Sequence, residues 1–169
     1  MKNLIVISDV DGCLTDGKFV YTAEGKISKT FGPHDNDGVK LLRKNGIETI
    51  FISADKRGFP ITEKRITDMK CQITCVSETD RADYIKKYID DGYDVIFFGD
   101  GLGDLAAFIK NSYSEAIYFV APANARWQVQ DAAHFVTENI GGEGAFLDLA
   151  EWVVERFVDD PVELYKITL

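Results

Sequence analysis

Cysteine is scarce in this chain of 169 residues, with three in all, at Cys13, Cys71 and Cys75. An odd number of cysteines without paired spacing does not fit a disulfide framework. Cys71 and Cys75 are four positions apart, and no further cysteine or histidine pair lies near them to complete a zinc site. We therefore expect reduced thiols, in the core or on the surface.

Long apolar runs are missing as well. The first apolar run, residues 4–7, is too short for the hydrophobic part of a signal peptide. No segment approaches the roughly 18 apolar residues of a membrane-spanning helix. We expect a cytoplasmic protein that does not enter a membrane.

Basic residues are outnumbered, with 19 Lys and Arg against 28 Asp and Glu, so the net charge is −9. This balance argues against nucleic acid and against anionic membrane surfaces as partners. It is still compatible with an anionic substrate, because a bound metal and a few local cations can reverse the field inside one pocket.

The remaining composition is that of a globular protein. Hydrophobic residues make up 46% and aromatic residues 12% of the chain, which excludes a disordered segment. The length suits one domain, residues 1–169, with a sizeable core. There is no internal repeat, low-complexity tract or linker.

Short apolar runs alternate with helical patterns along the chain. Runs typical of buried strands occupy residues 4–7, 48–52, 72–76, 94–98, 116–120 and 134–136. Apolar positions at helical spacing occur at 37–44, 61–69, 82–89 and 146–157. Pro60 suits the first turn of the second of these helices, and Gly46 suits the end of the first. The alternation predicts an α/β fold, a parallel sheet with helices on both faces.

One insertion interrupts the alternation. Residues 18–21 and 26–31 are β-prone, and they flank the turn signal Thr22-Ala23-Glu24-Gly25. We expect a β-hairpin flap directly after the first strand, and the chain has no room for a large cap domain.

The first strand runs into two acids, Asp9 and Asp11. In an open α/β sheet, ligands bind at the carboxyl ends of the strands. A carboxylate pair at such a position is costly unless a cation compensates it. A divalent metal site and a nucleophile paired with a general acid both explain the pair, and a solvated acidic loop is the alternative.

A second acidic segment, Asp100-Gly101-Leu102-Gly103-Asp104, follows the buried run at 94–98. Parallel strands share one rim, so Asp9, Asp11 and Asp100 can converge on one cation. Mg²⁺ suits them, because it is a hard ion that binds few carboxylates together with waters and phosphate oxygens.

Two further segments supply candidate phosphate ligands. Ser53 and Ala54 follow the run at 48–52, where a hydroxyl and backbone amides could donate to a phosphate oxygen; an ordinary capping serine is the alternative. Arg81 opens the helix at 82–89, against the dipole preference for helix starts, so we expect it to face an anion unless it is a solvated surface arginine.

These four segments, in this order, resemble the four motifs of the haloacid dehalogenase (HAD) phosphohydrolases. The first, D-x-D-G-x-L-T-D-G, and the segment Gly141-Gly142-Glu143-Gly144-Ala145 resemble the small capless branch of 3-deoxy-D-manno-octulosonate (KDO) 8-phosphate phosphatases. The likeness extends over residues 9–157. It implies a Rossmann-like HAD core, Mg²⁺ and a homotetramer in which the 141–145 segment enters a neighbour's site.

The resemblance also implies a division of roles. Asp9 is the expected nucleophile, which forms an aspartyl-phosphate, and Asp11 the general acid and base. Asp9, the Asp11 carbonyl and Asp100 are the expected Mg²⁺ ligands, supported by Asp104. The expected phosphate ligands are Ser53, Ala54 and Arg81, and the expected substrate contacts are Thr15, His34, Arg57, Arg65 and Gly142.

The chain departs from the family pattern in three motifs. The second motif usually continues Thr-Gly-Arg or similar, and here it reads Ser53-Ala54-Asp55-Lys56-Arg57 with a small insertion. The third-motif cation is normally lysine, and Arg81 stands there; Lys86 and Lys87 follow on the same helix. The fourth motif reads G-D-G where the branch commonly has G-D-D, a variant similar to that of phosphoserine phosphatases. These departures bear on substrate identity more than on chemistry.

Three functions remain open. The first is a Mg²⁺-dependent phosphatase of a small phosphorylated sugar acid or of another metabolite such as phosphoserine. The second is a non-catalytic oligomerisation module, similar to the HAD domain of CMP-sialate synthetases. The third is a response-regulator receiver phosphorylated on Asp55, which explains neither the hairpin nor Asp100.

Overall fold

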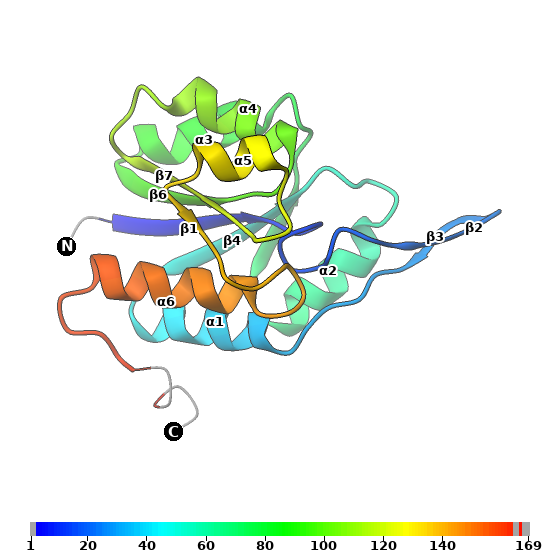
Figure 1. The fold of residues 1–169 in the computed structure, drawn as a ribbon, viewed down its shortest axis with the longest axis horizontal. Helices are drawn as coiled ribbons and strands as arrows, with labels where there is room; N and C mark the ends of the chain where they lie inside the picture. Colours follow the sequence, from blue (N-terminus) through cyan, green and yellow to red (C-terminus); the bar gives the residue numbers. More distant parts are fainter. Residues whose placement is uncertain (1–2, 164–165, 167–169) are drawn as a thin grey trace.

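The computed structural model describes residues 3–163 and 166. Its centre is one parallel sheet with the strand order β5-β4-β1-β6-β7-β8 (Figure 1). The strands are β1 (Asn3–Asp9), β4 (Glu48–Ser53), β5 (Gln72–Cys75), β6 (Tyr93–Phe98), β7 (Ile117–Ala121) and β8 (Phe135–Val136). All six lie within two residues of the runs expected from the sequence, which confirms the α/β assignment.

In the described part of the chain, six helices cover the sheet. They are α1 (His34–Lys44), α2 (Phe59–Asp68), α3 (Arg81–Asp90), α4 (Leu102–Asn111), α5 (Trp127–Ala132) and α6 (Ala145–Phe157). The helical patterns expected from the sequence did not include α4 or α5; α5 is short and buries only Val129. The first helix begins at His34 and not at Asp37, so His34 and Asp35 belong to its first turn.

The two faces of the sheet carry separate cores, because successive side chains of a strand point to opposite faces. Val6 packs with the apolar sides of α1, α2 and α6, whereas Ile5 and Ile7 pack with α3, α4 and α5. Figure 1 shows these helix layers above and below the sheet. The arrangement confirms the expectation of helices on both faces.

Helix α6 belongs to the first core. A Cβ added at Gly38 on α1 would lie 2.8 Å from the Phe146 ring and 2.9 Å from the Phe146 carbonyl oxygen, so glycine permits the close approach of α1 and α6. After α6 the chain returns to Asn45, whose side chain exchanges hydrogen bonds of 2.8 and 3.3 Å with the backbone of Val162. Residues 158–163, which follow α6, form no helix or strand.

The predicted hairpin is present as β2 (Val20–Thr22) and β3 (Gly25–Ser28), an antiparallel pair. It projects from the body at the end of the sheet where β1 terminates (Figure 1). Four large apolar side chains on it are exposed by 44–55%: Phe19, Val20, Tyr21 and Ile27. No helix within 3–163 is long and apolar enough to cross a bilayer.

Candidate active site

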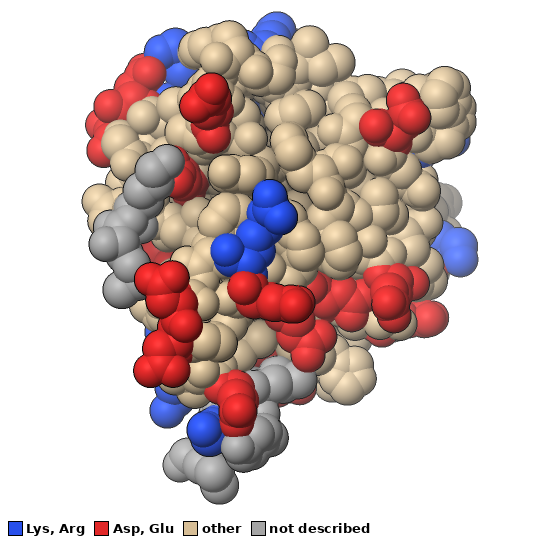
Figure 2. All heavy atoms as spheres, turned by 60° about the vertical axis from the view of Figure 1, so that its left-hand side comes forward, with Lys and Arg blue, Asp and Glu red and all other residues tan. Residues whose placement is uncertain are grey.

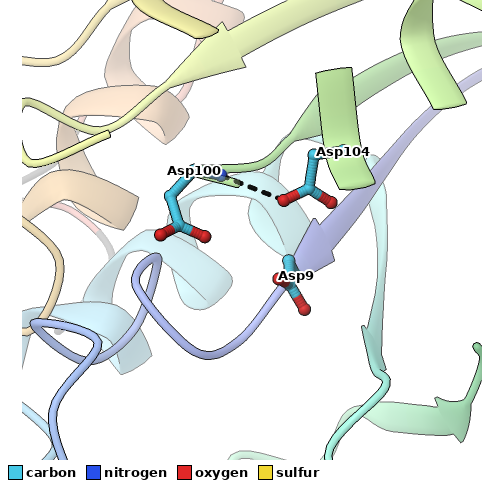
Figure 3. A group of neighbouring side chains, drawn as sticks. All are labelled: Asp9, Asp100 and Asp104. Carbon is cyan, nitrogen blue, oxygen red and sulfur yellow. Dashed lines mark hydrogen bonds between the residues drawn. The ribbon is translucent and has the colours of Figure 1, made fainter. Parts of the chain in front are cut away.

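Three carboxylates meet at the carboxyl end of the central strands. Asp9 ends β1, Asp100 follows the adjacent β6, and Asp104 lies in the first turn of α4. Each contributes a carboxylate oxygen to a group whose members lie within 4.8 Å of one another (Figure 3). The parallel pairing of β1 with β6 brings the two acidic motifs together, as the sequence predicted.

Burial makes this cluster electrostatically costly. Burial is the main cause that raises the pKa of Asp9 well above its usual value, and repulsion from Asp104 adds to it. The same two causes raise the pKa of Asp100 to about 7. Burial also raises the pKa of Asp104. Hard oxygen ligands with raised proton affinity are what a divalent cation would stabilise, so these residues fit a Mg²⁺ site.

Gly12 makes room for the cluster. Its φ is +90°, in the left-handed region, and a Cβ at this position would collide with the carboxylate of Asp100. The glycine of the D-x-D-G motif therefore allows the loop after β1 to pass directly over the second acidic strand end.

Arg81 is the cation of the cluster. It is the first residue of α3 and only 3% exposed, and its Nη1 is ion-paired with Asp104. Nη1 and Nη2 also lie 3.4 Å from the two carboxylate oxygens of Asp9. The expectation that Arg81 faces an anion is confirmed, while its contact with a phosphoryl group remains a prediction.

Asp104 is held from two sides. Its Oδ2 accepts hydrogen bonds from the backbone N–H of Asp100 (3.2 Å) and of Gly101 (3.1 Å), and its Oδ1 pairs with Arg81. The dashed line in Figure 3 marks the bond from Asp100. This geometry suits the supporting role expected of Asp104.

Asp11 lies outside the acidic cluster and has a different partner. Its carboxylate oxygens lie 2.7 and 2.9 Å from Nζ of Lys29, and Ser53 Oγ donates to it at 3.5 Å. The two acids of the D-x-D motif thus have different surroundings. That difference is the physical basis for giving them different chemical roles.

The sequence did not identify Lys29 as a site residue. Its side chain is fully buried, and Nζ also donates to Thr62 Oγ1 at 2.9 Å and pairs with Asp55 at 2.8 Å. Lys26 reaches the same Asp55 oxygen at 2.5 Å. Burial acts to raise the pKa of Asp55, but hydrogen bonds from Lys26 and Lys29 lower it to about 2. Nothing in the sequence around Lys26 and Lys29 indicated that both side chains point toward the acids at the rim of the sheet.

Ser53 and Ala54 follow β4 at the same rim. Ser53 is fully buried, and its Oγ accepts a hydrogen bond from the Asp55 N–H at 3.2 Å. Ala54 lines the cavity described below. Both lie at the end of β4, the position that the sequence predicted, and Ser53 Oγ is 3.5 Å from the carboxylate of Asp11.

Thr15 is fully buried, and its Oγ1 accepts hydrogen bonds from the N–H groups of Gly12 (3.1 Å) and Gly17 (3.2 Å). The structure thus gives Thr15 a role in shaping the loop after β1, not the exposed position that its expected substrate contact requires.

Asn124, which the sequence did not single out, joins this loop to the glycine segment: it donates to Gly12 O at 2.9 Å and accepts from Gly141 N at 2.7 Å. Gly142 lies with Gly141 beside the base of the hairpin, in the same chain.

The other expected substrate contacts lie outside the acidic cluster. His34 is about half exposed and lies 3.7 Å from Asp37. Arg57 donates to Tyr21 Oη at 3.4 Å, and Arg65 donates to Gly32 O at 2.8 Å. The second histidine, His134, lies away from the cluster and accepts a hydrogen bond from the Phe119 N–H through Nδ1.

A cavity of about 560 Å³ opens over the cluster. Besides the acids and Arg81 it is lined by Phe19 and Lys26 of the hairpin and by two residues that the sequence did not single out, Glu78 and Arg126. A larger cavity, about 680 Å³, lies at the amino ends of the strands, where Figure 2 shows a band of acidic side chains. Three acids line this larger cavity, Glu48, Asp94 and Asp159, but among the described residues the group whose carboxylate oxygens lie within 4.8 Å of one another is Asp9, Asp100 and Asp104, so the first cavity is the candidate active site.

Comparison with known proteins finds a relative over most of the chain. The chain is 30% identical over 154 residues to the KDO 8-phosphate phosphatase KdsC of Haemophilus influenzae, with 89% of this chain and 82% of the relative covered. It is also 22% identical over 158 residues to N-acylneuraminate cytidylyltransferase of Oncorhynchus mykiss, of which it spans 35%. No family profile matches the chain.

The fold comparison agrees with the sequence comparison. The cobalt-bound form of the octulosonate 8-phosphate phosphatase from Haemophilus influenzae superposes with a TM-score of 0.75 at 30% identity. The match covers 90% of this chain and 88% of that one.

Proposed function

Because the chain belongs to the KDO 8-phosphate phosphatases of the HAD superfamily, we propose that it is a metal-dependent phosphatase of a phosphorylated sugar acid. The observation that carries this proposal is the separation of the two acids after β1. Asp9 lies in the acidic cluster beside Arg81, whereas Asp11 lies outside it beside Lys29 and Ser53. KDO 8-phosphate, the compound in the name of the bacterial relative, is the proposed substrate.

Asp9, Asp100 and the backbone carbonyl of Asp11 are the proposed ligands of Mg²⁺, supported by Asp104. When bound, the ion offsets the charge of the three buried carboxylates and of the phosphoryl oxygens. The proposal draws support from the hard oxygen donors of the cluster and from the raised pKa values that burial imposes on them.

In the first half-reaction Asp9 Oδ attacks phosphorus, and the bond from phosphorus to the sugar oxygen breaks. Asp11 gives its proton to that oxygen, so the sugar acid leaves as an alcohol and Asp9 carries the phosphoryl group. In the second half-reaction Asp11 takes a proton from water, which attacks phosphorus. Inorganic phosphate leaves and the Asp9 carboxylate is restored.

The phosphoryl oxygens need positive charge and hydrogen-bond donors in both steps. Arg81, the hydroxyl of Ser53 and the backbone N–H of Ala54 are the proposed donors. Arg81 replaces the lysine usual in this motif, and a planar guanidinium can hold Asp9 and an adjacent phosphoryl oxygen at the same time.

Assembly and location complete the proposal. The exposed apolar hairpin is an open β-edge, and a lone hairpin is marginally stable in water, so burial between copies would stabilise it. We propose a homotetramer in the cytoplasm, in which a neighbouring copy narrows the open cavity, its 141–145 segment included. This part rests on the hairpin and on the resemblance.

A second candidate is a non-catalytic assembly module, prompted by the similarity to a cytidylyltransferase. A module of that kind has no need for a costly buried acid cluster, which favours the enzyme. Phosphoserine and other metabolites remain alternative substrates.

The test is phosphate release from a panel of phosphorylated metabolites, with Mg²⁺ and with EDTA. We expect metal-dependent turnover and the highest kcat/KM for KDO 8-phosphate. If phosphoserine alone is hydrolysed, it takes the place of KDO 8-phosphate as the proposed substrate. If none of the phosphate esters is hydrolysed, the result supports the non-catalytic assembly module.

A further inference from the structure

The cavity over the acidic cluster holds one cation without an anionic partner. Three basic residues line it, Lys26, Arg81 and Arg126. Lys26 is paired with Asp55, and Arg81 with Asp9 and Asp104. Within the described part of the chain, the exposed guanidinium of Arg126 has no ion pair or hydrogen bond of its own.

The backbone of Arg126 is nevertheless fixed relative to the site. Its N–H donates to the carbonyl oxygen of Asp100 at 3.2 Å, and its own carbonyl accepts from Val129 (2.9 Å) and Gln130 (3.1 Å). Gln130 Nε2 in turn donates to the carbonyl oxygens of Ala123 and Ala125, which holds the turn before α5. The backbone of Arg126 is therefore anchored next to Asp100, a proposed metal ligand, and its unpaired side chain starts from that fixed point.

The lining of the cavity is otherwise unfavourable to a second negative charge on the substrate. Six carboxylates line it: Asp9, Asp11, Asp55, Glu78, Asp100 and Asp104. A phosphorylated sugar acid carries a carboxylate besides its phosphate, and Arg81 is already committed to the phosphoryl end. The fork of a guanidinium matches a carboxylate in a bidentate arrangement.

We propose that Arg126 binds the carboxylate of the sugar-acid leaving group and thereby selects acidic substrates. This inference rests on the proposed function and extends it to a specificity-determining residue. It assigns Arg126 to the leaving group, not to the transferred phosphoryl group.

The experiment compares kcat/KM for KDO 8-phosphate and for the methyl ester of its carboxylate. In the wild type we expect the free acid to be favoured. Arg126→Gln should lower kcat/KM for the acid on the order of 10- to 100-fold, and that for the ester less than about 3-fold. Arg126→Lys should recover part of the preference, because it keeps the charge and loses the fork.

Arg156→Gln is the matched control, since Arg156 lies at the amino ends of the strands and the change removes the same charge. An equal loss on acid and ester in Arg126→Gln would assign Arg126 to the phosphoryl group and overturn the inference. No loss on either substrate would overturn it as well. Melting curves of each variant exclude a folding defect as the cause.

A second pair, 6-phosphogluconate and glucose 6-phosphate, separates this inference from the proposed substrate. KDO 8-phosphate could fail as a substrate while kcat/KM is higher for 6-phosphogluconate than for glucose 6-phosphate, and Arg126→Gln could remove that difference. The proposed substrate would then be wrong, and the inference about Arg126 would stand. If the wild type favours the acid in neither pair, the inference is wrong.

Discussion

The guanidinium of Arg81 lies 3.4 Å from the carboxylate of Asp9, although 72 positions of sequence separate the two residues. Both are nearly inaccessible, with exposures of 3% for Arg81 and 8% for Asp9. Arg81 also pairs with Asp104, so one cation serves two buried acids. The pairing lowers the cost of keeping the carboxylate of Asp9, the proposed nucleophile, ionised in a buried position.

Asp9→Asn should abolish turnover, with a loss of at least about 10³-fold in kcat, because an amide oxygen is a poor nucleophile. Phosphate release with saturating Mg²⁺ measures the loss, and binding of beryllium fluoride should require Asp9. Phosphate release near the wild-type rate in Asp9→Asn would contradict the aspartyl-phosphate mechanism.

Arg81→Ala should lower kcat/KM by about 10²- to 10³-fold, the range for a lost donor to a developing charge. Because the change also leaves buried acids unpaired, Arg81→Lys serves as a second variant that keeps the charge, and we expect it to retain more activity and stability. Lys86→Ala is the control: Lys86 lies on the same helix, half exposed, in a surface pair with Asp90. A large loss in Lys86→Ala with none in Arg81→Ala would move the role to Lys86.

Lys29→Met should reduce kcat by about tenfold or more and lower the melting temperature, because Asp11 and Asp55 lose a fully buried partner. Lys18→Met, in the segment before the same hairpin but 85% exposed, should have little effect on either measurement. Similar kinetics and melting temperatures for both variants would show that the buried pairing of Lys29 has no role.

Asp35 should make folding stability depend on pH. The residue is fully buried, neither carboxylate oxygen has a hydrogen-bond partner among the described residues, and Arg65 lies 3.9 Å away. Burial raises the pKa of Asp35 from 3.8 to about 7, with Arg65 opposing the change. The pKa of Asp35 is higher in the folded state than in the unfolded state. Its contribution to the free energy of unfolding is therefore fully present below about pH 4 and is lost as the pH rises toward 7.

Asp35→Asn should remove this dependence. Relative to the wild type, the free energy of unfolding of the variant should increase between pH 4 and pH 8, by at most about 4 kcal/mol. Urea unfolding at several pH values measures it. Asp37→Asn, on the same helix turn but about one-third exposed, is the control. A constant difference between Asp35→Asn and the wild type across this pH range would refute the prediction.

Ile27→Glu should break the proposed homotetramer, because it introduces a charge on an apolar hairpin side chain that is 55% exposed. Ile109→Glu on α4, where the isoleucine is 59% exposed, is a matched control that should leave assembly unchanged. Light scattering at assay concentration gives the mass. A wild type that is monomeric and fully active would defeat the proposal.

Deleting residues 138–169 would be a poor test of assembly, since α6 supplies buried core residues such as Phe146.

The sequence alone determined the order of the strands, four of the six helices in the described part of the chain, and the acidic rim of the sheet. Asp9 and Asp100 each come at or just after the end of an apolar strand, and parallel pairing brings such ends together whatever the details of packing. The hairpin was predictable for a similar reason, because a four-residue turn signal between β-prone runs is local.

Only the tertiary structure decided which side chain faces which partner. The packing of the hairpin, α3 and the turn before α5 around the rim decides three features. It pairs Lys29 with Asp11, pairs Arg81 with Asp104 and leaves the side chain of Arg126 unpaired. These contacts join segments 18 or more residues apart. Local propensity and periodicity do not encode the direction of a long, flexible basic side chain, so a buried lysine and a solvated one look alike in the sequence.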